Sequence, residues 1–205
     1  SMQGMTIGER ARLYVDVEAG SDTNNGKATT TAVQSIDRAL VLANAYQQAI
    51  ICLKRGQTHV ATDKSNEYGM GIQLYHRTLR FEAYGTASDQ PKIQNAIFAY
   101  NCNLEWKDID LTGNSSVFTM YNTIANFESC SLYFVESKNS FSKVYLCGIH
   151  GKWTQYGGFS TISSANPVSI QANEGARIDC SSSTIGECGN DGTSMISIDG
   201  GTQSE

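Results

Sequence analysis

The feature that most constrains the fold is a hydrophobic strand pattern that recurs about every twenty residues from residue 78 onward. Only the stretch 33–43 has its apolar residues spaced along one helical face, and it lies near the start of the chain. Short strands at a regular spacing, entered through a single helix, are typical of a solenoid whose open end must be covered. The sequence therefore predicts an all-β chain built from stacked strands.

The repeating units align through four inward-facing positions that lie two, three and two residues apart. The first unit places Leu104, Trp106, Ile109 and Leu111 at these positions. Equivalent side chains would stack at about 4.8 Å, the spacing of paired strands. An antiparallel sandwich with evenly spaced strands is the alternative. Shifts of 21, then 17, then 36 residues predict three further sets of inward residues: Ala125, Phe127, Cys130 and Leu132; Ser142, Val144, Cys147 and Ile149; Ile178, Cys180, Ser183 and Ile185.

The 36-residue shift is much longer than the others. We expect the extra residues to form a side loop near 153–167, and an additional unit would also fill the gap. A capping box at 31–34 predicts where the helix begins. The chain then divides into three parts: an expression-derived scar and flexible arm at 1–12, an N-terminal cap of strand, helix and strand at 13–60, and repeating strands at 61–205.

Composition excludes several classes of protein. The net charge is -5 and no basic stripe is present, so we expect no nucleic-acid partner. No apolar run approaches the roughly 20 residues that span a bilayer, so we expect no membrane insertion. The 6 cysteines form no Cys-x-x-Cys pair and have no histidine at zinc-ligand spacing. We therefore expect reduced and mostly buried thiols, no metal site and no cofactor.

Several short motifs occur near the start of the chain in a recognisable order. On these motifs the chain resembles the N-terminal half of pectin-lyase-like right-handed parallel β-helix proteins. The resemblance extends over residues 13–200 and is clearest over 13–111. The motifs are Tyr14-Val15-Asp16, Gly20-Ser21-Asp22, Asn25-Gly26, the helical stretch 36–43, Leu53-Lys54-Arg55-Gly56, and Tyr84-Gly85 followed by Pro91 and Ile93.

The resemblance implies a three-sheet solenoid with the first helix capping its N-terminal end, and carbohydrate as the usual ligand. Among the subfamilies, the chain is most similar to bacteriophage tailspike and tail-fibre proteins. This similarity implies a homotrimer in a virion tail that recognises bacterial surface polysaccharide, or alternatively a secreted bacterial protein. Because one fold serves many functions, a polysaccharide depolymerase and a purely architectural virion component are the other two readings.

A depolymerase of the glycoside hydrolase type needs two carboxyl groups about 5 to 9 Å apart. The candidates are Asp179, Glu187 and Asp191, which lie close together in the last units. Acidic residues in polar turns are more often solvated turn residues, and Asn190-Asp191-Gly192 is a good turn sequence. A lyase would need a cation or a basic cluster instead.

Carbohydrate binding has a different set of candidates, which all lie in the expected side loop. Trp153, Tyr156 and Phe159 carry aromatic rings on which a sugar could stack, and Gln155 could bond to hydroxyl groups. The alternative is that these rings fold back over the strands or fill a subunit interface, where aromatic residues are also enriched.

Overall fold

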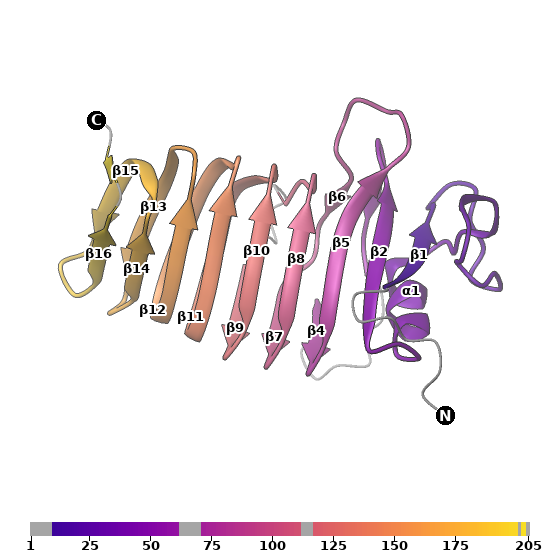
Figure 1. The fold of residues 1–205 in the computed structure, drawn as a ribbon, viewed down its shortest axis with the longest axis horizontal. Helices are drawn as coiled ribbons and strands as arrows, with labels where there is room; N and C mark the ends of the chain where they lie inside the picture. Colours follow the sequence, from indigo (N-terminus) through magenta and orange to yellow (C-terminus); the bar gives the residue numbers. More distant parts are fainter. Residues whose placement is uncertain (1–9, 62–70, 112–116, 201, 204–205) are drawn as a thin grey trace.

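A computed structural model describes residues 10–61, 71–111, 117–200 and 202–203, and they are mostly β. They form one sheet of 15 strands and a second sheet of two strands. Figure 1 shows the strands arranged along the long axis of the molecule. Every strand pair among the described residues is parallel, including pairs between strands that follow closely in sequence. The antiparallel alternative is therefore wrong.

The elements have the following bounds. The small sheet consists of β3 (Thr58–His59) and β6 (Lys92–Ile93). The large sheet consists of β1 (Ala11–Val15), β2 (Gln48–Lys54), β4 (Ile72–Tyr75), β5 (Thr78–Tyr84), β7 (Ile97–Tyr100), β8 (Asn103–Lys107), β9 (Val117–Tyr121), β10 (Ile124–Glu128), β11 (Ser131–Cys147), β12 (His150–Ser164), β13 (Val168–Asn173), β14 (Arg177–Ser181), β15 (Thr184–Asn190), β16 (Met195–Asp199) and β17 (Thr202–Gln203).

The strand pairings fall into three rows. Row A joins β1, β2, β5, β8 and β10 and continues through the C-terminal parts of β11 and β12 into β14 and β16. Row B joins β4, β7 and β9 and continues through the middle of β11 and β12 into β13 and β15. Row C joins β3 to β6 and continues through bridges at Asp110, Ser131 and His150. From β2 to β11, each unit of the chain passes through rows A, C and B in turn.

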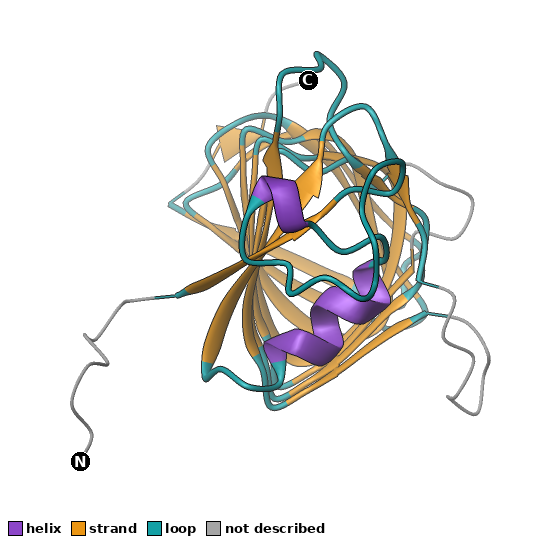
Figure 2. Ribbon diagram, turned by 90° about the vertical axis from the view of Figure 1, so that its right-hand side faces the viewer, coloured by secondary structure: helices purple, strands orange, loops and turns teal. Residues whose placement is uncertain are grey.

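The large sheet is curled into a half-barrel, which is visible when the molecule is viewed along its long axis (Figure 2). Side chains that face the inside of the curve stack from unit to unit. Phe81, Trp106 and Phe127 occupy paired positions in row A. The first two rings are stacked at 4.2 Å and the last two at 5.9 Å, and all three side chains are buried. This internal column forms the centre of the hydrophobic core.

The repeat is confirmed with one correction to its register. Leu104 pairs with Ala125 and Ala125 with Val144, so the second shift is 19 residues and not 17. Cys147 consequently pairs with Glu128 and is exposed, whereas Cys130 is buried. The predicted inward column through Cys147 is therefore wrong. Side chains in a strand alternate between its two faces with a period of two. An alignment that is wrong by two residues therefore gives the same inward and outward pattern as the correct one.

The predicted side loop near 153–167 is also wrong, because residues 150–164 form strand β12. This strand pairs with β11 on one side and with β13 and β14 on the other. The 36-residue gap therefore contains one additional unit. Gly157 and Gly158 allow the bend within β12, and a Cβ at Gly158 would lie 2.3 Å from the backbone oxygen of Asn139.

The one α-helix of the described residues, α1 (Ile36–Ala43), ends at Ala43 as predicted but begins four residues later than the capping box indicated. It begins after Ser35, whose hydroxyl oxygen accepts a hydrogen bond from the backbone N–H of Arg38 at 3.1 Å. The predicted capping box at 31–34 is wrong, because Thr31 ends the 3₁₀ turn η1 (Thr29–Thr31) and Ser35 is the N-cap of α1. The buried face of α1 packs beside β1 and β2, at the N-terminal end of the sheet in Figures 1 and 2.

Candidate functional site

Exposed aromatic side chains gather at one corner of the molecule, where row B ends and row A begins. We call Tyr75, Tyr100, Tyr121 and Phe141 the aromatic ladder, because they come from four consecutive units. Tyr75 pairs with Tyr100, Tyr100 with Tyr121, and Tyr121 with Ser140, the residue before Phe141. Tyr75 is 51% exposed, Tyr121 45% and Phe141 71%. Contiguous exposed apolar surface of this kind marks binding sites.

The rings of the aromatic ladder contact one another in sequence. Tyr75 and Tyr100 are stacked with centroids 5.3 Å apart, and Tyr121 lies 6.4 Å from Tyr100 at a tilt of 34°. Phe141 stands almost perpendicular to Tyr121, with centroids 5.7 Å apart. The tyrosines can therefore offer ring edges and hydroxyl groups to a ligand, which both donate and accept hydrogen bonds. Phe141, at the end of the ladder, offers the largest exposed fraction of the four.

The corner beside the ladder has an unusual backbone. His76, Asn101, Asn122 and Phe141 each have a positive φ, between 46° and 56°. Asparagine tolerates this conformation, and the side-chain amide of Asn122 donates to Oδ1 of Asn101 at 2.8 Å. For a bulky residue such as phenylalanine the left-handed region costs roughly 1–2 kcal/mol. In the fourth unit the aromatic side chain thus occupies the strained position itself.

Two lysines lie on either side of Phe141. Lys138 is in row B and Lys143 in row A, and both are exposed. Neither takes part in an ion pair among the described residues. The row A neighbours of Lys143 are Ile124 and Thr161, which carry no charge. Glu136, also exposed, is the acidic residue nearest to Lys138 along the strand, so the two lysines leave the corner around Phe141 with a small positive excess on a chain whose net charge is -5.

The charges at the N-terminal end of row A are arranged differently, because they are paired. Glu105 accepts hydrogen bonds from Arg10 at 2.8 Å and from Arg80 at 2.9 Å. Arg80 also binds Glu82, which in turn pairs with Arg12. The hydrogen bond from Arg10, followed by that from Arg80, lowers the pKa of Glu105 to about 2. This network stabilises the sheet, and every arginine in it is already engaged by a carboxylate.

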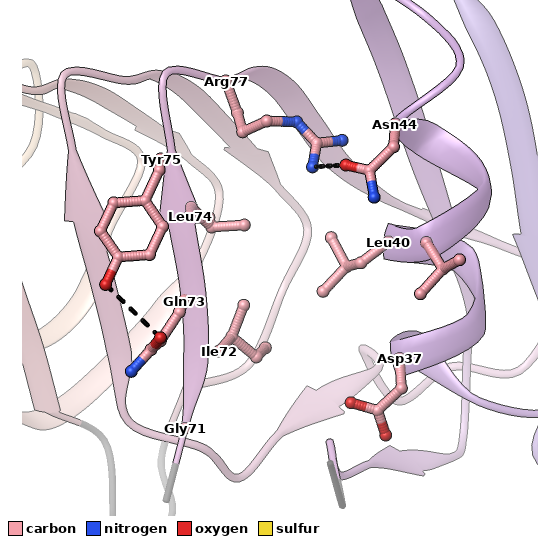
Figure 3. A pocket seen from close by; sticks show the side chains of 10 residues that line it. Asp37, Leu40, Asn44, Gly71, Ile72, Gln73, Leu74, Tyr75 and Arg77 are labelled. Atoms are coloured by element: carbon pink, nitrogen blue, oxygen red, sulfur yellow. Dashed lines mark hydrogen bonds between the residues drawn. The ribbon is translucent and has the colours of Figure 1, made fainter. Parts of the chain in front are cut away.

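A groove adjoins the first ring of the aromatic ladder. Figure 3 shows it between helix α1 and strand β4. Its volume is about 370 Å³. Leu40, Ile72 and Leu74 line it with apolar surface, and Tyr75 belongs to both the groove and the ladder. Arg77 donates a hydrogen bond to Oδ1 of Asn44 at 2.6 Å across one end. The mixture of apolar and polar groups suits a small amphipathic group such as a sugar ring.

A second groove, of about 490 Å³, lies along row C. Its lining is mostly polar and includes the side chains of Asp89, Lys92 and Asp110. Lys92 pairs with Asp110 through the backbone, but the two side chains form no ion pair. The sequence did not point to this groove, because Asp89 lies in a bend of one unit and Asp110 at a β-bridge of the next.

The four predicted carbohydrate-binding residues divide into two pairs. Trp153 and Gln155 are fully buried, with Trp153 against Phe118 and Phe127. Oε1 of Gln155 accepts four hydrogen bonds inside the core, including one from Asn139 Nδ2 at 2.9 Å. These two residues support the fold and cannot stack on a sugar. Their partners in the prediction, Tyr156 and Phe159, reach the surface near the corner of the aromatic ladder: Phe159 is 39% exposed, and the next residue, Ser160, pairs with Ser142.

The predicted catalytic carboxylates lie on two different rows. Asp179 is in row A and receives a hydrogen bond from Ser181, whereas Glu187 is in row B beside Ser169. Asp191 accepts hydrogen bonds from the backbone of Glu174 and from Thr193 and Ser194, and these bonds lower its pKa. Such a carboxylate stabilises a turn and is poorly suited to donate a proton. No hydrogen bond joins any two of the three among the described residues.

The sequence signal for the ladder is present but weak. A tyrosine precedes a histidine or asparagine at Tyr75, Tyr100 and Tyr121, and Phe141 follows twenty residues later. These positions face outward, so a search for the apolar core passes over them. Only the register of row B brings the four residues together.

No protein-family model, characterised protein or solved structure matches the chain. Across the described ranges, no group of three or more histidine, cysteine, aspartate or glutamate side chains is placed to hold a metal ion. In the same part of the chain, no helix has the length and apolar character needed to cross a bilayer.

Proposed function

We propose that the chain is a binding module that recognises a bacterial surface polysaccharide along the aromatic ladder. The observation that carries this proposal is the line of four rings at one corner, three of them well exposed, on four consecutive units. Sugar rings pack their apolar C–H faces on aromatic rings and bond to hydroxyl groups at the ring edges. A linear polysaccharide lying along the corner would contact several units at once.

The strained backbone at Phe141 supports a role in binding. Folding alone would favour an asparagine at this position, as in the two preceding units. An exposed phenylalanine in this conformation costs stability without filling the core. Such costs are found where a side chain serves a function.

We also propose the architecture that the resemblance implies, a right-handed three-sheet β-helix capped by α1. Support comes from the three rows that the chain visits in turn, and from the packing of α1 beside β1 and β2. The division into an N-terminal cap at 13–60 and repeating strands at 61–205 belongs to the same proposal. The homotrimer and the location in a virion tail come from the sequence resemblance alone.

The test is an array of purified bacterial capsular and O-antigen polysaccharides, probed with the full chain and with a Tyr121→Ala/Phe141→Ala double variant. We expect the wild type to bind a subset of the polysaccharides and the double variant to bind them about tenfold more weakly, because two stacking rings are lost. Tyr133→Ala is the matched control, since Tyr133 is 47% exposed on β11 and lies outside the ladder. It should bind like the wild type.

Two results would reject the proposal: equal binding by the double variant and the wild type, or no binding to any polysaccharide by the wild type. Release of reducing ends or of an unsaturated product from a bound polysaccharide would instead establish the depolymerase. The melting temperature of each variant, measured alongside, separates loss of binding from loss of folding.

A further inference from the structure

We propose that the polysaccharide bound at the aromatic ladder is acidic, and that Lys138 and Lys143 hold its carboxylate groups on either side of Phe141. This inference rests on the binding function proposed above and names the class of ligand. It starts from the contrast between two sets of basic residues. Arg10, Arg12 and Arg80 at the N-terminal end of row A are each paired with a carboxylate, whereas the two lysines form no ion pair among the described residues.

The two lysines are close enough to Phe141 to act together with it. Lys138 is three residues before Phe141 and Lys143 two residues after it, which limits the backbone separations to roughly 11 and 7 Å. The chain turns at Phe141, where φ is 52°. The lysines therefore extend from the two faces that meet at this corner, with the exposed ring between them.

The surroundings of the lysines contain little negative charge. Lys138 pairs with Thr119 and Lys143 with Ile124 on the preceding unit. Glu136 is the nearest acidic residue along the strand, and it forms no ion pair with Lys138. A ligand carboxylate would therefore meet cations without displacing a protein carboxylate.

Aromatic rings continue on the following unit, so the site has more than one position for a sugar. Lys138 lies between the paired positions Ser137–Gln155 and Asn139–Gly158, which places it opposite the stretch that contains Tyr156. Phe159 follows Gly158 directly and is 39% exposed. Sugar rings would stack on the aromatic side chains, and their charged groups would point toward the lysines.

The test uses the same kind of array, with each acidic bacterial polysaccharide printed beside its carboxyl-reduced derivative. The wild type should bind the acidic form at least tenfold more tightly than the reduced form, because reduction leaves the sugar backbone and removes only the charge. Lys138→Gln and Lys143→Gln should each weaken binding about threefold to fivefold, the range of an exposed ion pair. Raising the salt concentration should weaken wild-type binding more than binding by the Lys138→Gln/Lys143→Gln variant.

Lys107→Gln is the matched control, because Lys107 is a partly exposed lysine on an outer face of row A that already pairs with Glu128. It should bind like the wild type. Equal binding to acidic and reduced polysaccharides, or unchanged binding by the lysine variants, would overturn this inference. The ladder function would survive either result if Tyr121→Ala/Phe141→Ala still loses binding. No binding to any polysaccharide would reject both.

Discussion

Phe141 is a single residue that lowers the stability of the fold at its position. It occupies a left-handed backbone conformation with φ of 52°, and its side chain is 71% exposed. Asn101 and Asn122 occupy the same corner in the two preceding units, and an asparagine side chain fits this conformation better. The phenylalanine therefore supplies a surface ring at a position where the backbone does not favour one.

Two substitutions separate the backbone cost from the loss of the ring. Phe141→Asn and Phe141→Ala both remove the contact with Tyr121, but only asparagine tolerates the left-handed conformation well. We expect the asparagine variant to be more stable than the alanine variant by about 1 kcal/mol in urea denaturation. Both variants should lose polysaccharide binding to the same extent. An alanine variant as stable as the asparagine variant would show that the backbone at this corner is not strained.

Trp153 has the opposite character, because it is fully buried against Phe118 and Phe127. We expect Trp153→Ala to destabilise the chain by about 3–5 kcal/mol, the cost of deleting a large core side chain. Chemical denaturation followed by circular dichroism would measure this loss. A variant that keeps its stability and loses only binding would place Trp153 on the surface, as the sequence first suggested.

Among the elements, row A depends on ionised side chains at its N-terminal end. Hydrogen bonds from Arg10 and then Arg80 lower the pKa of Glu105 to about 2, below its ordinary value of 4.5. The ionised form therefore stabilises the folded state above pH 4.5, and this contribution is lost as the pH falls toward 2.

The pH dependence of this stabilisation gives a prediction for Glu105→Gln. The variant should be less stable than the wild type at pH 7, by less than about 1 kcal/mol because the side chain is one-third exposed. The difference should shrink as the pH is lowered from 5 to 2.5. Melting temperatures of both proteins across this range would measure it. A difference that stays constant with pH would mean that the charge of Glu105 does not contribute.

The elements also show what the sequence could and could not predict. The existence of α1 and its C-terminal end were predictable from its apolar face, but its start was not, because the pattern at 31–34 resembles a capping box while Ser35 is the actual N-cap. The register beyond residue 132 was not, because Cys147 passes for a small apolar residue and the strand pattern repeats every two residues. The pairing of Glu128 with Cys147 decides between the two registers.

The candidate site was only partly predictable from the sequence, because it also depends on the strand register. Tyr156 and Phe159 lie near the corner of the ladder, but they were assigned to a side loop because the 36-residue shift between aligned units left residues 153–167 without a strand. The four ladder residues were missed because an outward aromatic residue in one unit has no special signal. They form a surface only together with aromatic residues about twenty positions away, and the strand register is needed to show that these residues are neighbours.

At the scale of the whole molecule, the proposed homotrimer predicts a mass in solution of about three times 22.3 kDa. Light scattering coupled to size exclusion would measure this mass directly. A monomer at every concentration would reject the trimer. The ladder of a single chain would then have to provide all of the affinity, without the gain that multivalent binding gives.

The stacking of parallel units underlies both the core and the ladder, and one substitution can test it. Glu128 and Cys147 are paired neighbours in row A, and both side chains are exposed. Cα atoms of paired parallel strands lie about 4.8 Å apart, within the range that a disulfide bridges. Asn126→Cys is the control, because residue 126 pairs with Tyr145 and is displaced by two residues along the strand.

The decisive measurement is the number of free thiols in Glu128→Cys after mild oxidation of dilute protein. We expect this variant to lose two thiols through a bridge to Cys147 within one chain, whereas Asn126→Cys should keep all of its thiols under the same conditions. Failure of Glu128→Cys to form the bridge, or a bridge in Asn126→Cys instead, would contradict the stacking register on which the aromatic ladder depends.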